Sequence, residues 1–150
     1  MNDPAAAPPP LPLSPTTDLA DLRAAFAAMP FAQLLGLQFN DAARGEARVS
    51  LAPRPELTPL GDILHGGALA SLVDTAAAFA VMSLLAPGEQ TVTVDLTIHY
   101  LSAVTPATTR LDAHARVLRA GRRLATVTLN VSDERDRLIA TALTTYAKRA

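Results

Sequence analysis

The sequence contains no cysteine, which excludes a disulfide framework, a thiol nucleophile and a thiolate metal site. Histidine is also scarce: only His65, His99 and His114 are present, and no two of them stand at the spacing that pairs metal ligands on one helix. We therefore expect no zinc site and no other bound metal. The chain has no run of like charges and a formal net charge of -1, which argues against a nucleic-acid partner because such surfaces normally carry a basic stripe.

The N-terminus lacks the basic start and the apolar core of a secretory signal peptide. Six of the 12 prolines fall within the first fifteen residues, which favours an extended, polyproline-like tail. The whole chain of 150 residues is long enough for one domain with a sizeable core. We therefore predict a flexible tail over residues 1–17 and a single domain over residues 18–150, in a cytoplasmic protein.

Short helical segments and two strands are predicted in the first third of the chain. Asp18 can cap a helix over DLADLRAAFAAM, and residues 31–37 are expected to add another turn. Residues 37–40 and 46–52 alternate as two strands around the turn DAARG, in which Gly45 serves the turn.

The second half of the sequence has the strongest strand pattern. In QTVTVDLTIHYL, residues 90–101, strict alternation predicts one polar face and one apolar face, the latter formed by Val92, Val94, Leu96, Ile98 and Tyr100. Residues 108–118, 124–131 and 138–147 are predicted as three further strands. The turns between them, RAGRR and DERDR, are short, so these strands should be antiparallel neighbours in a meander.

The segment LHGGALASLVDTAAAFAVMSLLA, residues 64–86, is apolar enough to form a helix buried on most sides. Its length would span a bilayer, but Asp74 at its centre would cost about 2.5–3.5 kcal/mol there. The alternating strands instead need an apolar partner, and this helix is the only long candidate. We therefore predict an α+β fold without a membrane partner, in which a curved antiparallel sheet wraps around one long central helix.

Three segments carry a family resemblance: LHGGALASLVDTA, TVTVDLTIHYL and RAGRRLATV. Over roughly residues 31–147 the chain resembles the hotdog-fold acyl-CoA thioesterases of the phenylacetate-degradation type. His-Gly-Gly with an acid nine residues after the histidine is a fairly specific pattern, whereas HGG alone would be weak. The resemblance implies the hotdog fold and hydrolysis of an acyl-CoA thioester to the acid and coenzyme A, without a cofactor.

The resemblance also implies roles for individual residues. Asp74 would act as general base on water or as nucleophile. Gly66 would offer its backbone N–H to the thioester oxygen, which suits the unpaired donors and partial positive charge of a helix N-terminus. The other interpretation of Asp74 is a structural acid bonded to a neighbour such as Ser71 or Thr75. His65 would orient the loop or the water, or would serve only the start of the helix.

Thr93 occupies the place where the family often has a small polar residue, and there it could hold the attacking water; otherwise it is a surface threonine. Gly67 is expected to contact the substrate. Relatives use basic residues near the RAGRR turn to bind the phosphates of coenzyme A, which implies this role for Arg119, Arg122 and Arg123. A solvated hairpin tip would explain the same arginines.

One position departs from the family pattern. Many relatives have an asparagine six residues before the histidine, where it helps to position water, and Pro59 stands at that position here. The role of the asparagine is therefore empty or has passed to Thr58 or Asp62.

Helix geometry predicts the assembly. Gly66 and Asp74 are eight residues apart, or roughly 12 Å along a continuous helix. A reacting carbonyl must lie within about 3–3.5 Å of its nucleophile and bind the oxyanion donor as well. One helix cannot meet both demands, but two antiparallel copies can. We therefore predict a homodimer with shared active sites, and beyond it a dimer of dimers.

Two other functions remain possible for such a chain. An enoyl-CoA hydratase would share the fold, but it typically pairs an Asp and a His within a short loop motif that is absent here. A non-catalytic acyl-CoA-binding protein fused to DNA-binding helices would need a helix-turn-helix, for which the N-terminal segment leaves no room. The intact Asp74 and HGG motif favour the thioesterase.

Overall fold

The computed structural model describes residues 17–59 and 61–149. In chain order these residues form α1 (Leu19–Ala27), α2 (Pro30–Leu35), β1 (Leu37–Ala43), β2 (Glu46–Leu51), a 3-10 turn (Pro55–Leu57), α3 (Gly66–Met82), β3 (Gln90–Tyr100), β4 (Leu111–Ala120), β5 (Leu124–Asp133) and β6 (Leu138–Arg149). None of the helices within these ranges combines the length and hydropathy that a bilayer crossing requires. The tail predicted for residues 1–17 lies outside the described residues, apart from Thr17.

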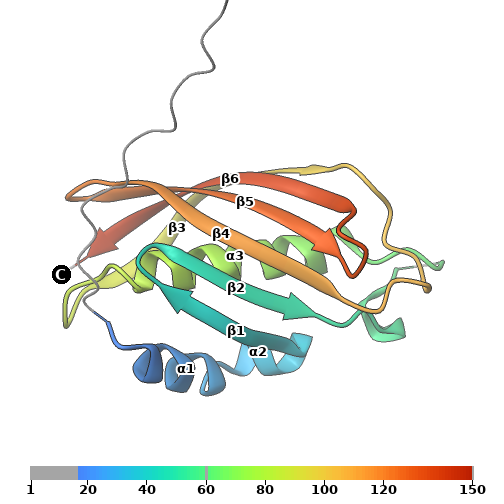
Figure 1. The fold of residues 1–150 in the computed structure, drawn as a ribbon, viewed down its shortest axis with the longest axis horizontal. Helices are drawn as coiled ribbons and strands as arrows, with labels where there is room; N and C mark the ends of the chain where they lie inside the picture. The colour runs from blue at the N-terminus through green and yellow to red at the C-terminus, as the bar shows by residue number, and fades with distance from the viewer. Residues whose placement is uncertain (1–16, 60, 150) are drawn as a thin grey trace, which may run out of the picture.

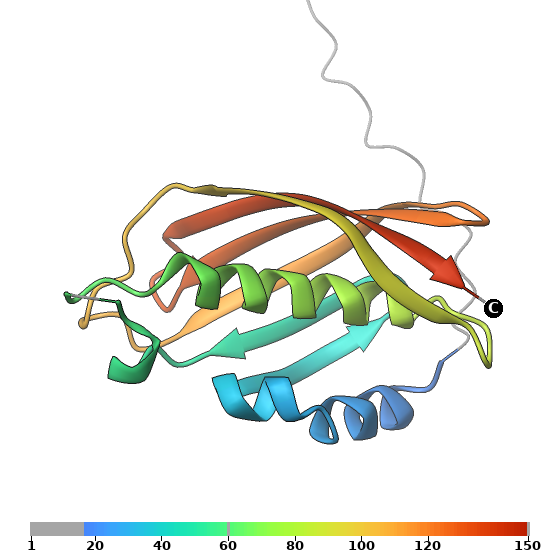
Figure 2. The same cartoon turned by 180° about the vertical axis from the view of Figure 1, so that it is seen from behind.

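The strands form one antiparallel sheet that curves around α3. In the described part of the chain its order is β1-β2-β4-β5-β6-β3. Figure 1 shows the sheet in front of α3, and Figure 2 shows α3 along its concave face, with β3 on one side and α1 and α2 on the other. The strands β4, β5 and β6 form the expected meander, whereas β3 occupies the far edge beside β6. The prediction of an α+β fold with a curved sheet around one long helix is confirmed.

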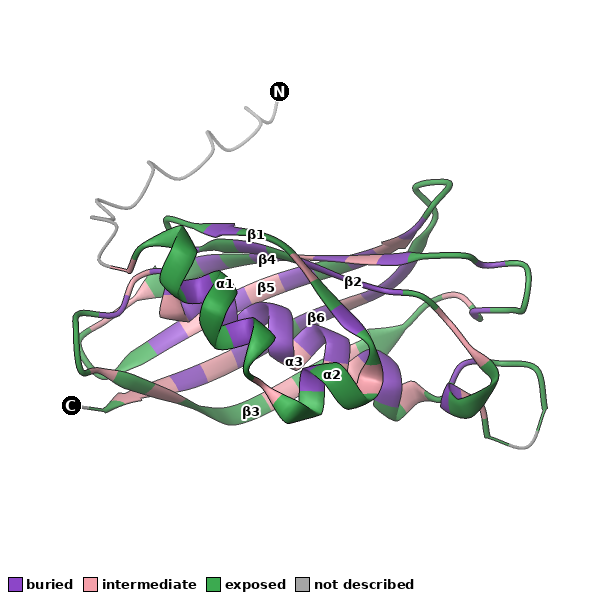
Figure 3. Cartoon of the chain, turned by 90° about the horizontal axis from the view of Figure 1, so that it is seen from below, coloured by how far each residue is buried: buried purple, intermediate pink, exposed green. Residues whose placement is uncertain are grey.

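The core lies between α3 and the sheet. Ten residues of α3 are buried, and Figure 3 shows the buried segments of helix and sheet facing each other. Phe79 of α3 packs against Phe26 of α1 and Phe39 of β1, with ring centroids 5.1 and 5.6 Å apart. Burial of each large apolar side chain contributes about 1.5–3 kcal/mol, so the sheet is most stable when it closes on this helix.

The helix α3 ends at Met82, before the apolar run of the sequence does. Ser83 is fully buried, and its hydroxyl accepts the N–H of Gly45 at 2.8 Å and donates to the carbonyl of Ala80 at 2.7 Å. Arg44 and Gly45 form the turn between β1 and β2, both with the positive φ of a type I′ hairpin. The hairpin predicted around DAARG is confirmed, and its turn holds the C-terminal end of α3.

The strand β3 differs from its prediction in a way that shapes the site. Its pairing with β6 shifts at Val94, which forms a β-bulge. The bulge reverses the face of every later residue, so Thr93 and Tyr100, an odd and an even position, both turn toward α3. The prediction that Val92 and Val94 lie on the same face as the later apolar residues is therefore wrong, and these two valines are 48% and 58% exposed.

Candidate active site

Asp74 lies on a side of α3 that the rest of the chain leaves partly open. Small or polar residues follow one another along this side at helical spacing, and we call them the open stripe: Gly67, Ala70, Ser71, Asp74 and Ala78. None of the five is fully buried. The carboxylate therefore has the core behind it and an opening in front of it, so the energetic cost of its position is smaller than in the core.

The carboxylate of Asp74 is anchored at one oxygen and open at the other. Oδ1 accepts a hydrogen bond from the Thr93 hydroxyl at 2.9 Å and another from the Tyr146 hydroxyl at 2.5 Å. No described residue donates to Oδ2. Every enclosed side-chain oxygen in the described residues has a partner, so Oδ2 is open to solvent. A carboxylate with one fixed and one open oxygen can take a proton from water or attack a carbonyl carbon.

Both donors to Asp74 come from the sheet and not from its own helix. Thr93 and Tyr146 stand opposite each other in the β3–β6 ladder, so the two strands present them together to the carboxylate. Ser71, the structural partner considered from the sequence, donates instead to a backbone carbonyl of α3 at 2.8 Å. The structure thus brings Thr93 to Asp74 and adds Tyr146, which the sequence analysis did not single out.

Tyr146 is 1% exposed, and its hydroxyl also lies 2.7 Å from the backbone carbonyl oxygen of Asp74. Burial raises the pKa of this phenol far above its ordinary value, and the hydrogen bond to Asp74 raises it further, so the hydroxyl stays a donor. The sequence feature that could have identified Tyr146 is the alternation of β6, which puts this tyrosine on the buried face of the strand. A buried tyrosine needs a partner for its hydroxyl, and Asp74 is the acid of the facing helix.

The start of α3 carries the expected backbone donor. His65 caps the helix, because its Nδ1 accepts the N–H of Gly67 at 2.8 Å. This geometry agrees with the interpretation that His65 serves the start of the helix. It also means that the Gly67 N–H already donates a hydrogen bond within the chain. No described residue accepts a hydrogen bond from the N–H of Gly66, which therefore remains a donor for a ligand at the helix N-terminus.

Tyr100, which sequence reasoning missed as a site residue, lies against Gly66. Its hydroxyl donates to the carbonyl oxygen of Gly66 at 2.9 Å. Its ring stands 3.3 Å from the place that a Cβ on Gly66 would occupy, so glycine suits this position for space. The peptide unit between Gly66 and Gly67 is thus held at its oxygen by Tyr100 and at its nitrogen by His65. A cavity of about 300 Å³ opens beside it.

Gly66 and Asp74 do not come together within one chain. The helix is continuous from Gly66 to Met82, which keeps the two residues roughly 12 Å apart along its axis. One carbonyl cannot bind the Gly66 N–H and meet the Asp74 carboxylate across that distance. Within one chain, Gly66 and Asp74 therefore cannot act on the same thioester.

A basic cluster lies at the end of the sheet near Tyr146. The Arg123 carbonyl accepts the N–H of Lys148 at 2.8 Å, which joins the β4–β5 turn to the end of β6. None of the basic residues gathered there forms an ion pair within the described chain, and we call them the basic end: Arg119, Arg122, Arg123, Lys148 and Arg149. In Figure 2 this end of the sheet lies opposite the start of α3.

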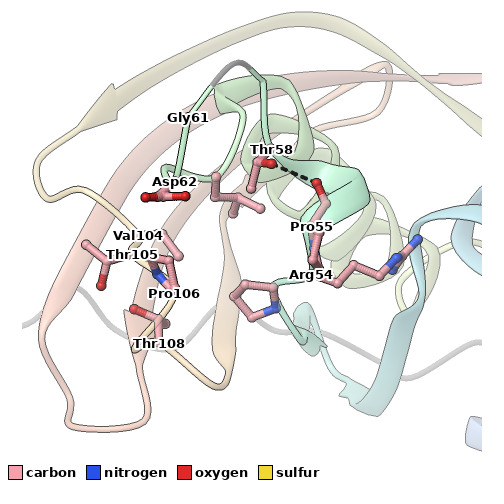
Figure 4. A pocket seen from close by; sticks show the side chains of 11 residues that line it. Arg54, Pro55, Thr58, Gly61, Asp62, Val104, Thr105, Pro106 and Thr108 are labelled. Atoms are coloured by element: carbon pink, nitrogen blue, oxygen red, sulfur yellow. Dashed lines mark hydrogen bonds between the residues drawn. The ribbon is translucent and has the colours of Figure 1, made fainter.

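The segment around Pro59 borders a second pocket of about 280 Å³, which shares Leu64 and Val104 with the first. Figure 4 shows Thr58 and Asp62 among the residues that line it. The Thr58 hydroxyl donates to a carbonyl of its own loop at 2.7 Å. Neither side chain forms a hydrogen bond to the Asp74 carboxylate of the same chain, so no described contact gives either one the role of the family asparagine.

Known proteins are similar to this chain in sequence and in fold. The family model described as Thioesterase superfamily matches residues 61–140, more than half of the chain. The medium/long-chain acyl-CoA thioesterase YigI of Salmonella typhimurium is 28% identical over 133 residues, which cover 79% of this chain and 84% of YigI.

Two solved structures extend the comparison. The conserved protein PA5202 of Pseudomonas aeruginosa is 35% identical with a TM-score of 0.76, over 81% of this chain and 94% of that one. A mutant form of the phenylacetic acid degradation protein PaaI of Thermus thermophilus is 30% identical with a TM-score of 0.72, over 79% of this chain and 98% of PaaI. These matches confirm the resemblance drawn from the sequence. The chain belongs to the thioesterase superfamily and is a thioester hydrolase with the hotdog fold.

Proposed function

We propose that the protein hydrolyses acyl-CoA thioesters, with Asp74 as the catalytic carboxylate. The observation that carries the proposal is the asymmetry of this carboxylate, whose Oδ1 is fixed by two hydroxyl donors while Oδ2 is open to solvent. In the reaction Oδ2 takes the proton of an attacking water, or it attacks the carbonyl carbon itself and forms an anhydride that water then opens. Either route breaks the C–S bond and releases the thiol of coenzyme A and the acid.

The N–H of Gly66 serves as the oxyanion donor in this proposal. It stands at the N-terminus of a 17-residue helix, where the helix dipole adds a partial positive charge. The neighbouring peptide unit is fixed by Tyr100 and His65, so little reorganisation is needed when the oxyanion forms. Thr93 donates to Oδ1 and keeps its lone pairs, with which it can accept a hydrogen bond from the attacking water.

Two chains form each site. The edge strand β3 is 11 residues long and exposes Val92 and Val94, and such an edge readily pairs with a second strand. A two-fold axis at this edge places the open stripes of two α3 helices antiparallel to each other. Gly66 of one chain then meets Asp74 of the other, and the same operation builds a second, equal site. A dimer of two such dimers remains our proposal for the larger assembly.

The coenzyme A half of the substrate runs toward the basic end. Arg122 and Arg123 bind its phosphates, because unpaired guanidinium groups form charge-assisted bonds with phosphate oxygens. This end belongs to the chain that supplies Asp74, since Tyr146 and Lys148 lie two residues apart on β6. The acyl half points toward the chain that supplies Gly66.

Thiol release from a panel of acyl-CoAs tests the function, with short, medium and long chains and a phenylacetyl group. We expect release of free coenzyme A from at least one of them. Asp74→Asn should lower kcat by about 10²–10⁴-fold, because it removes the base and keeps the size of the side chain. A folded Asp74→Asn variant with wild-type turnover would contradict the role of Asp74. An enoyl-CoA completes the panel: loss of its enoyl absorbance without thiol release would indicate a hydratase, and binding of the panel without turnover would indicate a sensor.

Tyr146→Phe should lower kcat about tenfold, the effect of losing a hydrogen bond worth about 1.5 kcal/mol to a charged group. The Asp74 carboxylate loses one of the two donors that fix Oδ1, so the loss should fall on kcat while KM changes by less than about twofold. Steady-state assays over a range of acyl-CoA concentrations measure both constants. Phe26→Leu, a change in the core away from the site, is the control for stability alone. An unchanged kcat in folded Tyr146→Phe would refute the positioning of Asp74 by this hydroxyl.

Replacing Arg122 and Arg123 together by alanine should raise KM for an acyl-CoA about tenfold, and KM for the matching acyl-pantetheine by less than about twofold. The reason is that only the full coenzyme carries the nucleotide phosphates. Arg135→Ala, on the exposed β5–β6 turn, is the matched control and should leave both values unchanged. Equal changes for the two substrates would mean that the β4–β5 turn is solvated surface.

A further inference from the structure

We propose that Tyr100 determines which acyl groups the enzyme accepts, as the fixed wall of an apolar acyl pocket beside Gly66. The proposal rests on the thioester hydrolysis proposed above. It adds the place of the acyl group in the molecule and the residue that limits its size.

The pocket lies between the start of α3 and the residues around the end of β3. Its volume is about 300 Å³. Its lining includes the buried apolar side chains of Leu64, Leu69 and Val104, with Ser102 and Ala103 beside them. Its rim consists of Ile63, Tyr100 and Leu101, which are 53%, 52% and 54% exposed. Large apolar side chains that gather half-exposed around one cavity are typical of a binding site for an apolar ligand.

The position of Gly66 in the wall of this pocket decides which half of the substrate enters it. A thioester whose oxygen meets the Gly66 N–H has its carbonyl carbon at the mouth of the pocket. One substituent of that carbon is the acyl group, and the other is the sulfur of coenzyme A. The pantetheine arm carries amides and hydroxyls that would lose hydrogen bonds among these side chains. A hydrocarbon chain loses none and gains from burial.

Tyr100 is a fixed wall because its ring and its hydroxyl are both held. The hydroxyl donates to the carbonyl of Gly66 at 2.9 Å, and the ring lies 3.3 Å from the place that a Cβ on that residue would occupy. The ring cannot swing aside for a longer chain without breaking this hydrogen bond to the peptide unit that follows the oxyanion donor. The pocket volume is at the lower end of the usual range of about 300–1,000 Å³, so small and medium acyl groups fit it.

The test is a series of straight-chain substrates from butyryl-CoA through octanoyl-CoA to palmitoyl-CoA, assayed with the full-length protein. The wild type should have its highest kcat/KM at or below octanoyl. Tyr100→Ala removes the wall, so the ratio of kcat/KM for palmitoyl to that for octanoyl should rise by about tenfold or more. Tyr100→Phe keeps the ring and loses the hydroxyl, so kcat should fall by a similar factor for every substrate while the order of substrates is kept.

Two further variants secure the test. Ile63→Ala opens the same rim and should raise the ratio of kcat/KM for palmitoyl-CoA to that for octanoyl-CoA, as Tyr100→Ala does. Because two variants report on the same pocket, the test still decides where one of them folds poorly. Leu143→Ala, on the outward side of β6, removes a side chain of similar exposure, 49%, and should leave the ratio unchanged. A wild-type ratio in both folded Tyr100→Ala and Ile63→Ala would overturn the acyl pocket while hydrolysis stands. Absence of thiol release from every substrate by the wild type would instead overturn the proposed function.

Discussion

The helix α3 is so apolar that it is stable only when it is enclosed, and its enclosure sets the rest of the structure. Ten of its residues are buried, and the described part of the chain has one sheet to cover them. The sheet therefore curves around the helix, and the α1–α2 segment closes one side through the contacts of Phe26 and Phe39 with Phe79. What the sheet leaves open is the stripe of small residues in which Asp74 stands.

This arrangement separates the parts of the proposed site along α3. The proposed oxyanion donor, Gly66, and the pocket beside it lie at the start of the helix. The carboxylate of Asp74 lies at the middle of the helix and contacts Tyr146, whose strand leads to the basic end. In the proposed complex, the acyl group lies beside Gly66 of one chain and the coenzyme A phosphates lie at the basic end of the other chain. In this account the dimer is required by the chemistry of the substrate, and the long exposed edge of β3 provides the surface for it.

The sequence allowed the fold and the acid to be predicted, because both depend on local patterns. The apolar run around Asp74 and the alternation of the later strands required a helix inside a sheet, and the HGG motif marked the free backbone donor at Gly66. Two tyrosines of the site were missed for different reasons. Tyr146 reaches Asp74 through a strand pairing that the alternation of β6 alone does not specify.

Tyr100 was placed on the apolar face of its strand but not against Gly66. The cause is the bulge at Val94, which depends on the pairing of β3 with β6 and leaves no mark in the regular alternation of TVTVDLTIHY. Without the bulge Thr93 and Tyr100 would face opposite sides of the sheet. With it, one strand contacts both the carboxylate of Asp74 and the carbonyl of Gly66. Irregularities of this kind come from tertiary pairing and therefore appear only in the structure.

The shared site is the central claim, and complementation between two inactive variants tests it most directly. One variant is Asp74→Asn, and the other is Gly66→Pro, which removes the oxyanion N–H. Proline is well tolerated at the first position of a helix, and the extended backbone of His65 (ψ 132°) suits a following proline.

After subunit exchange of equal amounts, half of the dimers are mixed, and each mixed dimer holds one site with both lesions and one with neither. The account predicts recovery of about a quarter of wild-type activity. Activity that stays at the level of the parent variants, although mixed dimers demonstrably form, would contradict it.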